Sequence, residues 1–588
     1  PSPAANIRTL IRRAYFDLIG LPPKPEEVEA FLQDESPQAF EKVVDGLLDS
    51  PQFGERWGRH WLDLVRYAES RGHEFEPNIP NAWQYRDYVI RALNADVPFD
   101  QFVTEHIAGD LVASPRLHPE AKFNESILGT GFWFLGEEVH SPVDIRKDET
   151  DRLDNRLDVM TKTFLGVTVT CARCHDHKFD AISQKDYYAL MGFLIGSGYR
   201  QVGFEALEHN RRIASELESL RKEARAELTK LTAAAIEPSI DRAADYLLAA
   251  REAVTKGAIN QETVTRNKLS EPLLKNWSAE LTKAKGEKTH PLHRFAAEDF
   301  KSQELRDRIA VPPEQILVSY LSADAPWYQD GFSFGQRPMQ AGEVRLGNSP
   351  DQPLAGVVQL GAAELDTSWP RMKVAGGTDK DHGGLGNWDR MGQTLRTAEV
   401  TLKTGNVWYL VRGSGRVYAA VNSHLVIAGP LHGAILREWD GKPVAAGGPP
   451  SGWQWVNHNL SAYTGHRLHF EFTPKEGAMA VAMVVDSDKQ PPPIWEATGE
   501  FAGSTAATAD EFARQFQAEC QRILKSLADN KLLDDAAPTA DFMIAHLDLF
   551  SLPEGELRQN LRKAAESFLA KQKELQQQIK TESHTALA

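Results

Sequence analysis

Cysteine is scarce in this sequence. Only Cys171, Cys174 and Cys520 occur among 588 residues, which excludes a small fold held by disulfides; a chain of this length can bury its own cores. Long apolar runs are also missing, since no window approaches the ~18 residues of a membrane helix. We therefore expect no membrane span. Basic residues are not in excess: 66 Lys and Arg face 82 Asp and Glu, a net charge of −16. No nucleic-acid partner is expected.

Several enzyme motifs are missing as well. The sequence has no Gly-x-Ser-x-Gly elbow, no phosphate-binding glycine-rich loop and no His-Glu-x-x-His helix. The acidic residues from Asp148 to Asp158 recur every three to four positions, and we expect them to form a solvated helix face rather than an acid–base site. The question of enzymatic activity stays open, but a hydrolase is not indicated.

The composition present is that of a globular multidomain protein. Hydrophobic residues make up 41%, aromatic residues 9% and charged residues 25%, and one domain per ~150 residues gives about four domains. The sequence starts at Pro1 without an initiator Met or a leader pattern. We expect that a leader has been removed or that the chain is a fragment of a longer protein.

Local signals divide the chain into four parts. Residues 1–204 are predicted to be short helices, with Asn6 as an N-cap and with Ser36 and Ser50 each placed before a proline. Residues 205–314 carry leucines among charged residues and are predicted to form long exposed helices in a hairpin. Residues 491–588 comprise a proline linker and C-terminal helices, the last of which is expected to pair with the 205–235 helix.

Residues 315–490 are predicted to form a β-sandwich of jelly-roll type. Alternating runs occur at Val407–Val411 and Leu468–Phe472. In the second run Leu468, Phe470 and Phe472 are expected to face the core, with His469 and Glu471 facing outward. Four aromatic side chains of this part are candidates for a platform that stacks on sugar rings, although core packing is the commoner use of such residues. They are Trp408, Tyr409, Trp453 and Trp455.

The closely spaced cysteines form the motif Cys171-Ala-Arg-Cys174-His175. This is the spacing of c-type haem attachment, in which two thiols reach the two vinyl groups of one porphyrin and the adjacent imidazole ligates the iron. Apolar helices are predicted on both sides, the second opened by a capping box of Ser183 and Asp186. We therefore predict a covalent haem c on Cys171 and Cys174, with His175 as an axial ligand.

Other interpretations of the motif stay open. Both cysteines with His175 or His177 could ligate zinc, although no second Cys/His pair of ligand spacing supplies a fourth ligand. A redox dithiol or a short-loop disulfide also fits. For the sixth iron position we rank His60 first, because it lies among large apolar side chains in Trp57–Asp63, and a five-coordinate iron is equally acceptable. The remaining candidates are His73, His140, Met160 and Met191.

Four segments together resemble a known family. They are RAYFDLIGLPP (Arg13–Pro23), GERWGRHWLD (Gly54–Asp63) followed by Arg66-Tyr67-Ala68, WQYRDYV (Trp83–Val89) and CARCHDHKFD (Cys171–Asp180). As an ordered set over residues 1–200 they resemble the planctomycete cytochrome c-like family, also called the domain of unknown function 1549. One departure is Asp180-Ala181-Ile182, where Asp-Pro-Ile is expected; it removes a rigid turn residue but no ligand.

The resemblance implies an exported bacterial protein, periplasmic or secreted, with haem c at Cys171, Cys174 and His175. It also implies electron transfer with a redox partner protein, in connection with polysaccharide breakdown. The expected fold class is thus α+β multidomain: a mainly helical cytochrome c-like domain, a long-helix hairpin and an inserted jelly-roll-like β-sandwich. The alternative function is a carbohydrate-binding or scaffold protein in which the cysteine motif is structural, as a zinc site or a disulfide.

Overall fold

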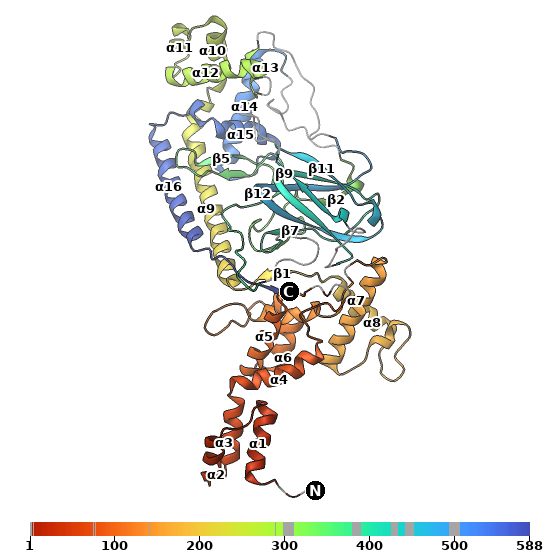
Figure 1. Cartoon of the computed structure of the whole chain (residues 1–588). Helices are drawn as coiled ribbons and strands as arrows, with labels where there is room; N and C mark the ends of the chain where they lie inside the picture. The colour runs from red at the N-terminus through yellow and green to blue at the C-terminus, as the bar shows by residue number, and fades with distance from the viewer. Residues whose placement is uncertain are drawn as a thin grey trace.

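The computed structural model describes most of the chain. The residues described are 3, 5–73, 76, 78–139, 141–287, 290–297, 311–378, 390–424, 433–441, 452–492 and 506–588. Helices and antiparallel sheets both occur, so the mixed α and β content that the sequence predicts is confirmed. In Figure 1 the first helices extend from one end of the molecule, while the strands and the later helices form the other end. No helix among these residues combines the length and apolar content needed to cross a membrane.

The first part of the chain is helical, as predicted. Asn6 Oδ1 accepts from the Thr9 amide at 2.8 Å and so caps the first helix, and Pro51 opens the fourth helix directly after Ser50. The helix expected at Pro37 begins two residues later, at Ala39. The helices are α1 (Ile7–Leu18), α2 (Pro25–Gln33), α3 (Ala39–Leu48), α4 (Pro51–Leu64), α5 (Ala82–Asn94), α6 (Phe99–Ala108), α7 (Ile145–Met160) and α8 (Gln184–Ile195).

A 34-residue helix, α9 (Leu207–Ile240), joins this part to the rest. The expected pairing with the last helix is confirmed, because α16 (Glu556–Gln577) packs along α9 (Figure 1). The rest of the segment predicted as a hairpin forms α10 (Ala243–Lys256), α11 (Gln261–Arg266), α12 (Glu271–Gly286) and α13 (His293–Ala296), and α10 packs against α12. Contrary to expectation, α9 is not exposed, since its buried face includes Leu217, Leu228 and Ile236.

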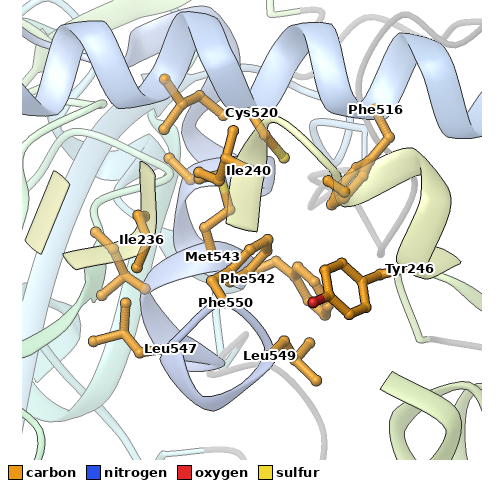
Figure 2. Close-up of a cluster of buried hydrophobic side chains, with 14 of the residues drawn as sticks. Ile236, Ile240, Tyr246, Phe516, Cys520, Phe542, Met543, Leu547, Leu549 and Phe550 are labelled. Carbon is orange, nitrogen blue, oxygen red and sulfur yellow. The ribbon is translucent and has the colours of Figure 1, made fainter. Parts of the chain in front are cut away.

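These helices share an apolar core with α14 (Ala509–Ala528) and α15 (Ala537–Ala545). Figure 2 shows Ile236 and Ile240 of α9 gathered with Phe516 and Cys520 of α14 and with Met543. Cys520 is fully buried, and burial raises the pKa of its thiol well above the usual value. It acts as a small apolar core residue.

The β region is built on two long antiparallel strands, β9 (Asn406–Val421) and β12 (Arg467–Asp486). Both alternating runs predicted from the sequence lie in them. Leu468, Phe470 and Phe472 are buried as expected, but Glu471 is buried as well. Its carboxylate lies 2.6 Å from Arg390, so the face predicted to be outward is covered. The other strands are β2 (Ile316–Ser319), β3 (Tyr328–Asp330), β4 (Val344–Leu346), β5 (Leu354–Val357), β6 (Ala363–Glu364), β7 (Thr394–Arg396), β8 (Val400–Thr401), β10 (Leu436–Trp439) and β11 (Gln454–Asn459).

The end of the described chain returns to its first part. Strand β13 (Thr585–Leu587) pairs antiparallel with β1 (Gln201–Gly203), and Leu587 is buried in the same apolar core as Tyr85 and Phe132. Asn81 donates to Thr585 Oγ1 at 2.7 Å. The last residues thus complete the core of the helical part instead of forming a separate tail.

Candidate cysteine-histidine site

The cysteine motif lies on a short helical turn between α7 and α8. Residues Thr170–Arg173 form a single 3₁₀ turn, and Ala172 in its middle is fully buried in a small apolar cluster with Leu157 and Tyr187. Because Ala172 points into the protein, its neighbours point out: Cys171, Cys174 and His175 are all exposed. Both cysteines are free thiols.

Acidic residues of α7 hold this turn. The guanidinium of Arg173 lies 3.1 Å from Asp154 and 3.2 Å from Asp151, and Thr170 Oγ1 donates to Asp158 Oδ1 at 2.6 Å. The expectation of a solvated acidic face is wrong here, because these carboxylates bind the motif's own neighbours. The sequence signal was their spacing by three and four, but it did not reveal which residues they would meet.

Helix α8 fixes the turn from the other side. The predicted capping box is confirmed: Asp186 accepts from Ser183 Oγ at 2.6 Å and from the Ser183 amide at 2.8 Å. Gln184 Nε2 and the Tyr188 hydroxyl both donate to the Arg173 carbonyl, at 3.2 Å and 3.1 Å. The turn is therefore bonded to α8 through the Arg173 carbonyl and to α7 through the side chains of Arg173 and Thr170.

His175 has one ring nitrogen bound and the other open. Its Nδ1 lies 2.8 Å from the Asp176 carbonyl oxygen, and because a carbonyl only accepts, Nδ1 carries the proton. In the neutral ring Nε2 is then the unprotonated nitrogen. A backbone carbonyl on the second nitrogen is the usual support of a metal-ligating histidine. The donor set at the motif, two exposed thiols and one oriented imidazole, fits the attachment of haem c.

His177 has a different role. Its Nδ1 accepts from the Asp180 amide at 2.8 Å and from the Phe179 amide at 3.3 Å, and only 6% of its side chain is exposed. The Ile182 carbonyl accepts from the His177 amide at 2.8 Å, so this loop closes with Ala181 in the place of the expected proline. His177 is a structural residue of the loop. Among the described residues, no three His, Cys, Asp or Glu side chains gather as a metal group.

The candidates for a sixth ligand are scattered. His60 is exposed on α4, with its ring 5.3 Å from that of Trp57, and no contact within the described ranges joins it to the cysteine turn. Met160 and Met191 pack in the same apolar cluster as Ala172, which places both methionines behind the turn. His73 is half-buried. His140 lies outside the described residues.

The four aromatic residues proposed for sugar stacking do not form one platform. Tyr409 is fully buried and its hydroxyl lies 2.8 Å from His458 Nδ1, so it belongs to the core. Trp408, Trp453 and Trp455 are half-buried against a second apolar cluster. The indole nitrogens of Trp408 and Trp455 donate to the carbonyls of Ser487 and Pro492, each at 3.0 Å.

The first part of the chain is thus a helical domain that presents a Cys-x-x-Cys-His turn on its surface. Residues 1–198 match the family described as PSCyt2, protein of unknown function (DUF1549). This is the family that the sequence motifs of this part predict. No curated protein and no solved structure matches the chain.

Proposed function

We propose that this chain is an exported c-type cytochrome-like electron-transfer protein. Cys171 and Cys174 would carry haem c as thioethers, and His175 would ligate the iron. When bound, the haem supplies one-electron chemistry. In this proposal the chain exchanges electrons with a redox partner protein. That electron transfer is linked to polysaccharide breakdown in the periplasm or outside the cell.

The observation that carries the proposal is the state of the three motif side chains. Two free thiols and an imidazole project from one turn, and the His175 Nδ1 bond to the Asp176 carbonyl at 2.8 Å leaves Nε2 open. A structural zinc site would need a fourth protein ligand, and His177 is already used by its own loop. The donor set therefore favours haem over zinc.

The surroundings of the motif support the same function. Leu165, Phe179 and Phe193, from the segments that flank the turn, are large apolar side chains that are mostly exposed. Exposed apolar surface of this kind marks contact with another group or partner. The ion pairs of Arg173 and the burial of Ala172 keep the two thiols on one side of a fixed turn, so the chain's own residues orient the attachment site before any group is bound.

Covalent haem content tests the proposal directly. The whole chain is expressed with an export signal in a bacterium that has a cytochrome maturation system, and the purified protein is examined by haem staining after denaturing electrophoresis. We expect a stained band with about one haem per chain by pyridine haemochrome absorbance. Cys171→Ala with Cys174→Ala should abolish the stain, because both thioethers are lost.

Matched variants separate attachment from folding. Cys520→Ala removes the only other thiol, which lies in the helical core, and should leave the stain unchanged. His175→Met should retain covalent haem while shifting the Soret band, because the ligand changes but the thiols do not. A colourless wild-type protein that is folded, as judged by circular dichroism, would overturn the proposal.

A further inference from the structure

Four arginines gather around one short segment of the helical domain. We call Arg66, Arg71, Arg152 and Arg156 the arginine cluster. Each contacts the segment 134–138: Arg66 Nη1 donates to the Leu135 carbonyl, Arg71 Nη1 donates to the Phe134 carbonyl at 2.5 Å, Arg152 lies 3.8 Å from Glu138, and the Arg156 guanidinium lies over the Phe134 ring at 5.2 Å.

The cluster holds more positive than negative charge. Its ion-pair partners among the described residues are two carboxylates, Glu138 and Asp148. Burial and the neighbouring cations lower the pKa of Arg156 to about 9, with Arg152 the largest of those neighbours. The carboxylate of Asp158 also acts on Arg66 electrostatically, so four guanidinium groups face three carboxylates. The excess positive charge is costly away from water.

Several donors of the cluster lack acceptors. Arg71 Nε, Arg71 Nη2 and Arg66 Nε are shut off from solvent and have no hydrogen-bond partner within the described ranges. Arg156 is 9% exposed; its guanidinium lies over the Phe134 ring and makes no hydrogen bond or ion pair with another described residue. A guanidinium offers five N–H donors, and buried donors of this kind are almost always bonded in proteins. These donors are suited to bind a ligand with several acceptor atoms.

The cluster is separate from the cysteine turn. On α7, Arg152 and Arg156 lie on roughly the opposite side from Asp154 and Asp158, which hold the turn, because an α-helix has 3.6 residues per turn. Arg152 instead reaches the β region, where it donates to the carbonyls of Asn422 and Ser423, each at 3.2 Å. The cluster therefore lies where α7 meets the end of β9.

We propose that the arginine cluster is a binding site for a phosphate or sulfate oxyanion. Such an anion brings the negative charge that the cluster lacks, and its oxygens accept the paired N–H donors that guanidinium groups present in a planar fork. Chloride supplies charge without this geometry and is expected to bind far more weakly. The bound anion would hold α7 in place against the β region.

Thermal unfolding of the whole chain measures the binding. Phosphate and sulfate are each titrated from micromolar to 10 mM with sodium chloride added to a constant ionic strength, so that screening stays fixed. We expect a saturable rise in the melting temperature with both oxyanions, because a ligand of the folded state stabilises in proportion to the logarithm of its concentration above the dissociation constant. The general stabilising effect of such salts does not saturate and needs far higher concentrations.

Arg156 is the residue to replace, because no hydrogen bond within the described ranges depends on it. Arg156→Met should weaken phosphate and sulfate binding at least tenfold, with a melting temperature in chloride no lower than that of the wild type, since an uncompensated buried charge is removed. Arg156→Lys should give an intermediate loss. The matched control is Arg12→Met, which removes the same charge and a similar arginine-ring contact, with Phe16 at 4.5 Å, on the exposed α1.

The outcomes divide clearly. A saturable rise that is lost in Arg156→Met and kept in Arg12→Met supports the site. No saturable rise in the wild type would overturn it, as would a rise that Arg156→Met leaves unchanged, which would place the anion elsewhere. Direct calorimetric titration of phosphate into the wild type and Arg156→Lys applies the same criteria if Arg156→Met does not fold.

Discussion

The guanidinium of Arg173, between the two cysteines, lies 3.1 Å from the Asp154 Oδ2 of α7. The other oxygen of Asp154 accepts from the Tyr187 hydroxyl of α8 at 2.5 Å. One carboxylate thus joins both flanking helices to the turn. This contact holds the turn that carries Cys171 and Cys174.

Removing this contact should loosen the cysteine turn. We expect Arg173→Gln to lower the opening free energy of the turn's backbone amides by about 1 kcal/mol, and Asp154→Asn by somewhat more because it also weakens the Tyr187 bond. Hydrogen exchange of the 170–184 peptides measures both. In a double-mutant cycle the pair should couple by about 0.5–1 kcal/mol.

The exposed pair Arg212 and Glu216 on α9, whose side chains lie 2.7 Å apart, is the control for that cycle. An exposed pair four residues apart on a helix is expected to couple by at most about 0.5 kcal/mol. A coupling energy between Arg173 and Asp154 no larger than this would show that their contact does not stabilise the cysteine turn.

Strand β13, at the end of the chain, should be essential for the stability of the helical domain. Leu587 is 2% exposed in the core of that domain, so Leu587→Ala should destabilise it by about 2–4 kcal/mol through lost burial and a cavity. Leu557→Ala on α16, at a leucine that is 42% exposed, should change stability by less than about 0.5 kcal/mol. Urea unfolding of each variant checks this; equal midpoints for the two would contradict it.

Glu582 should make the protein less stable as pH rises. Burial raises the pKa of its carboxyl to about 7, and the nearby Glu205 adds to this. The folded state therefore favours the protonated form, and its advantage is fully present below about pH 4.5 and lost as pH rises to about 7. Glu582→Gln should be as stable as the wild type near pH 4.5 and up to about 3 kcal/mol more stable above pH 7.

Thermal unfolding of Glu582→Gln across this pH range gives the difference. Glu574→Gln on the exposed side of α16 is the control, and its stability should follow that of the wild type at every pH. A constant offset between Glu582→Gln and the wild type would show that Glu582 does not titrate in this range.

His106 is predicted to stay neutral well below pH 6.5. It is fully buried among aromatic rings, with Nδ1 donating to the Phe102 carbonyl at 2.7 Å and Nε2 accepting from the Tyr85 hydroxyl at 2.8 Å. Burial lowers the pKa of the imidazole to about 4. Its contribution to stability is complete above pH 6.5 and is lost as pH falls toward 4.

Histidine-selective ¹³C NMR measures this pKa. The ring signals that disappear in His106→Gln should keep their neutral-form shifts from pH 7 to pH 5 and change only near pH 4. A midpoint near 6.5 for those signals would contradict the prediction.

Local patterns predicted much of the fold. The capping signals at Asn6 and Ser183 and the strand at Leu468–Phe472 depend on neighbours within a few residues, and the structure contains each of them. Other features could not be predicted because they depend on distant residues. Glu471 is buried because Arg390 lies beside it, and α9 pairs with α16 across more than 300 residues of sequence.

The candidate site divides in the same way. The sequence by itself determined the Cys-x-x-Cys-His motif and the family that residues 1–198 match, because both depend on residue types at fixed spacings along the chain. Only the tertiary structure decided that the acidic residues of α7 hold this turn, that His60 lies apart from it, and that four arginines gather around residues 134–138. Those relationships depend on distances between side chains from separate segments, which packing alone sets.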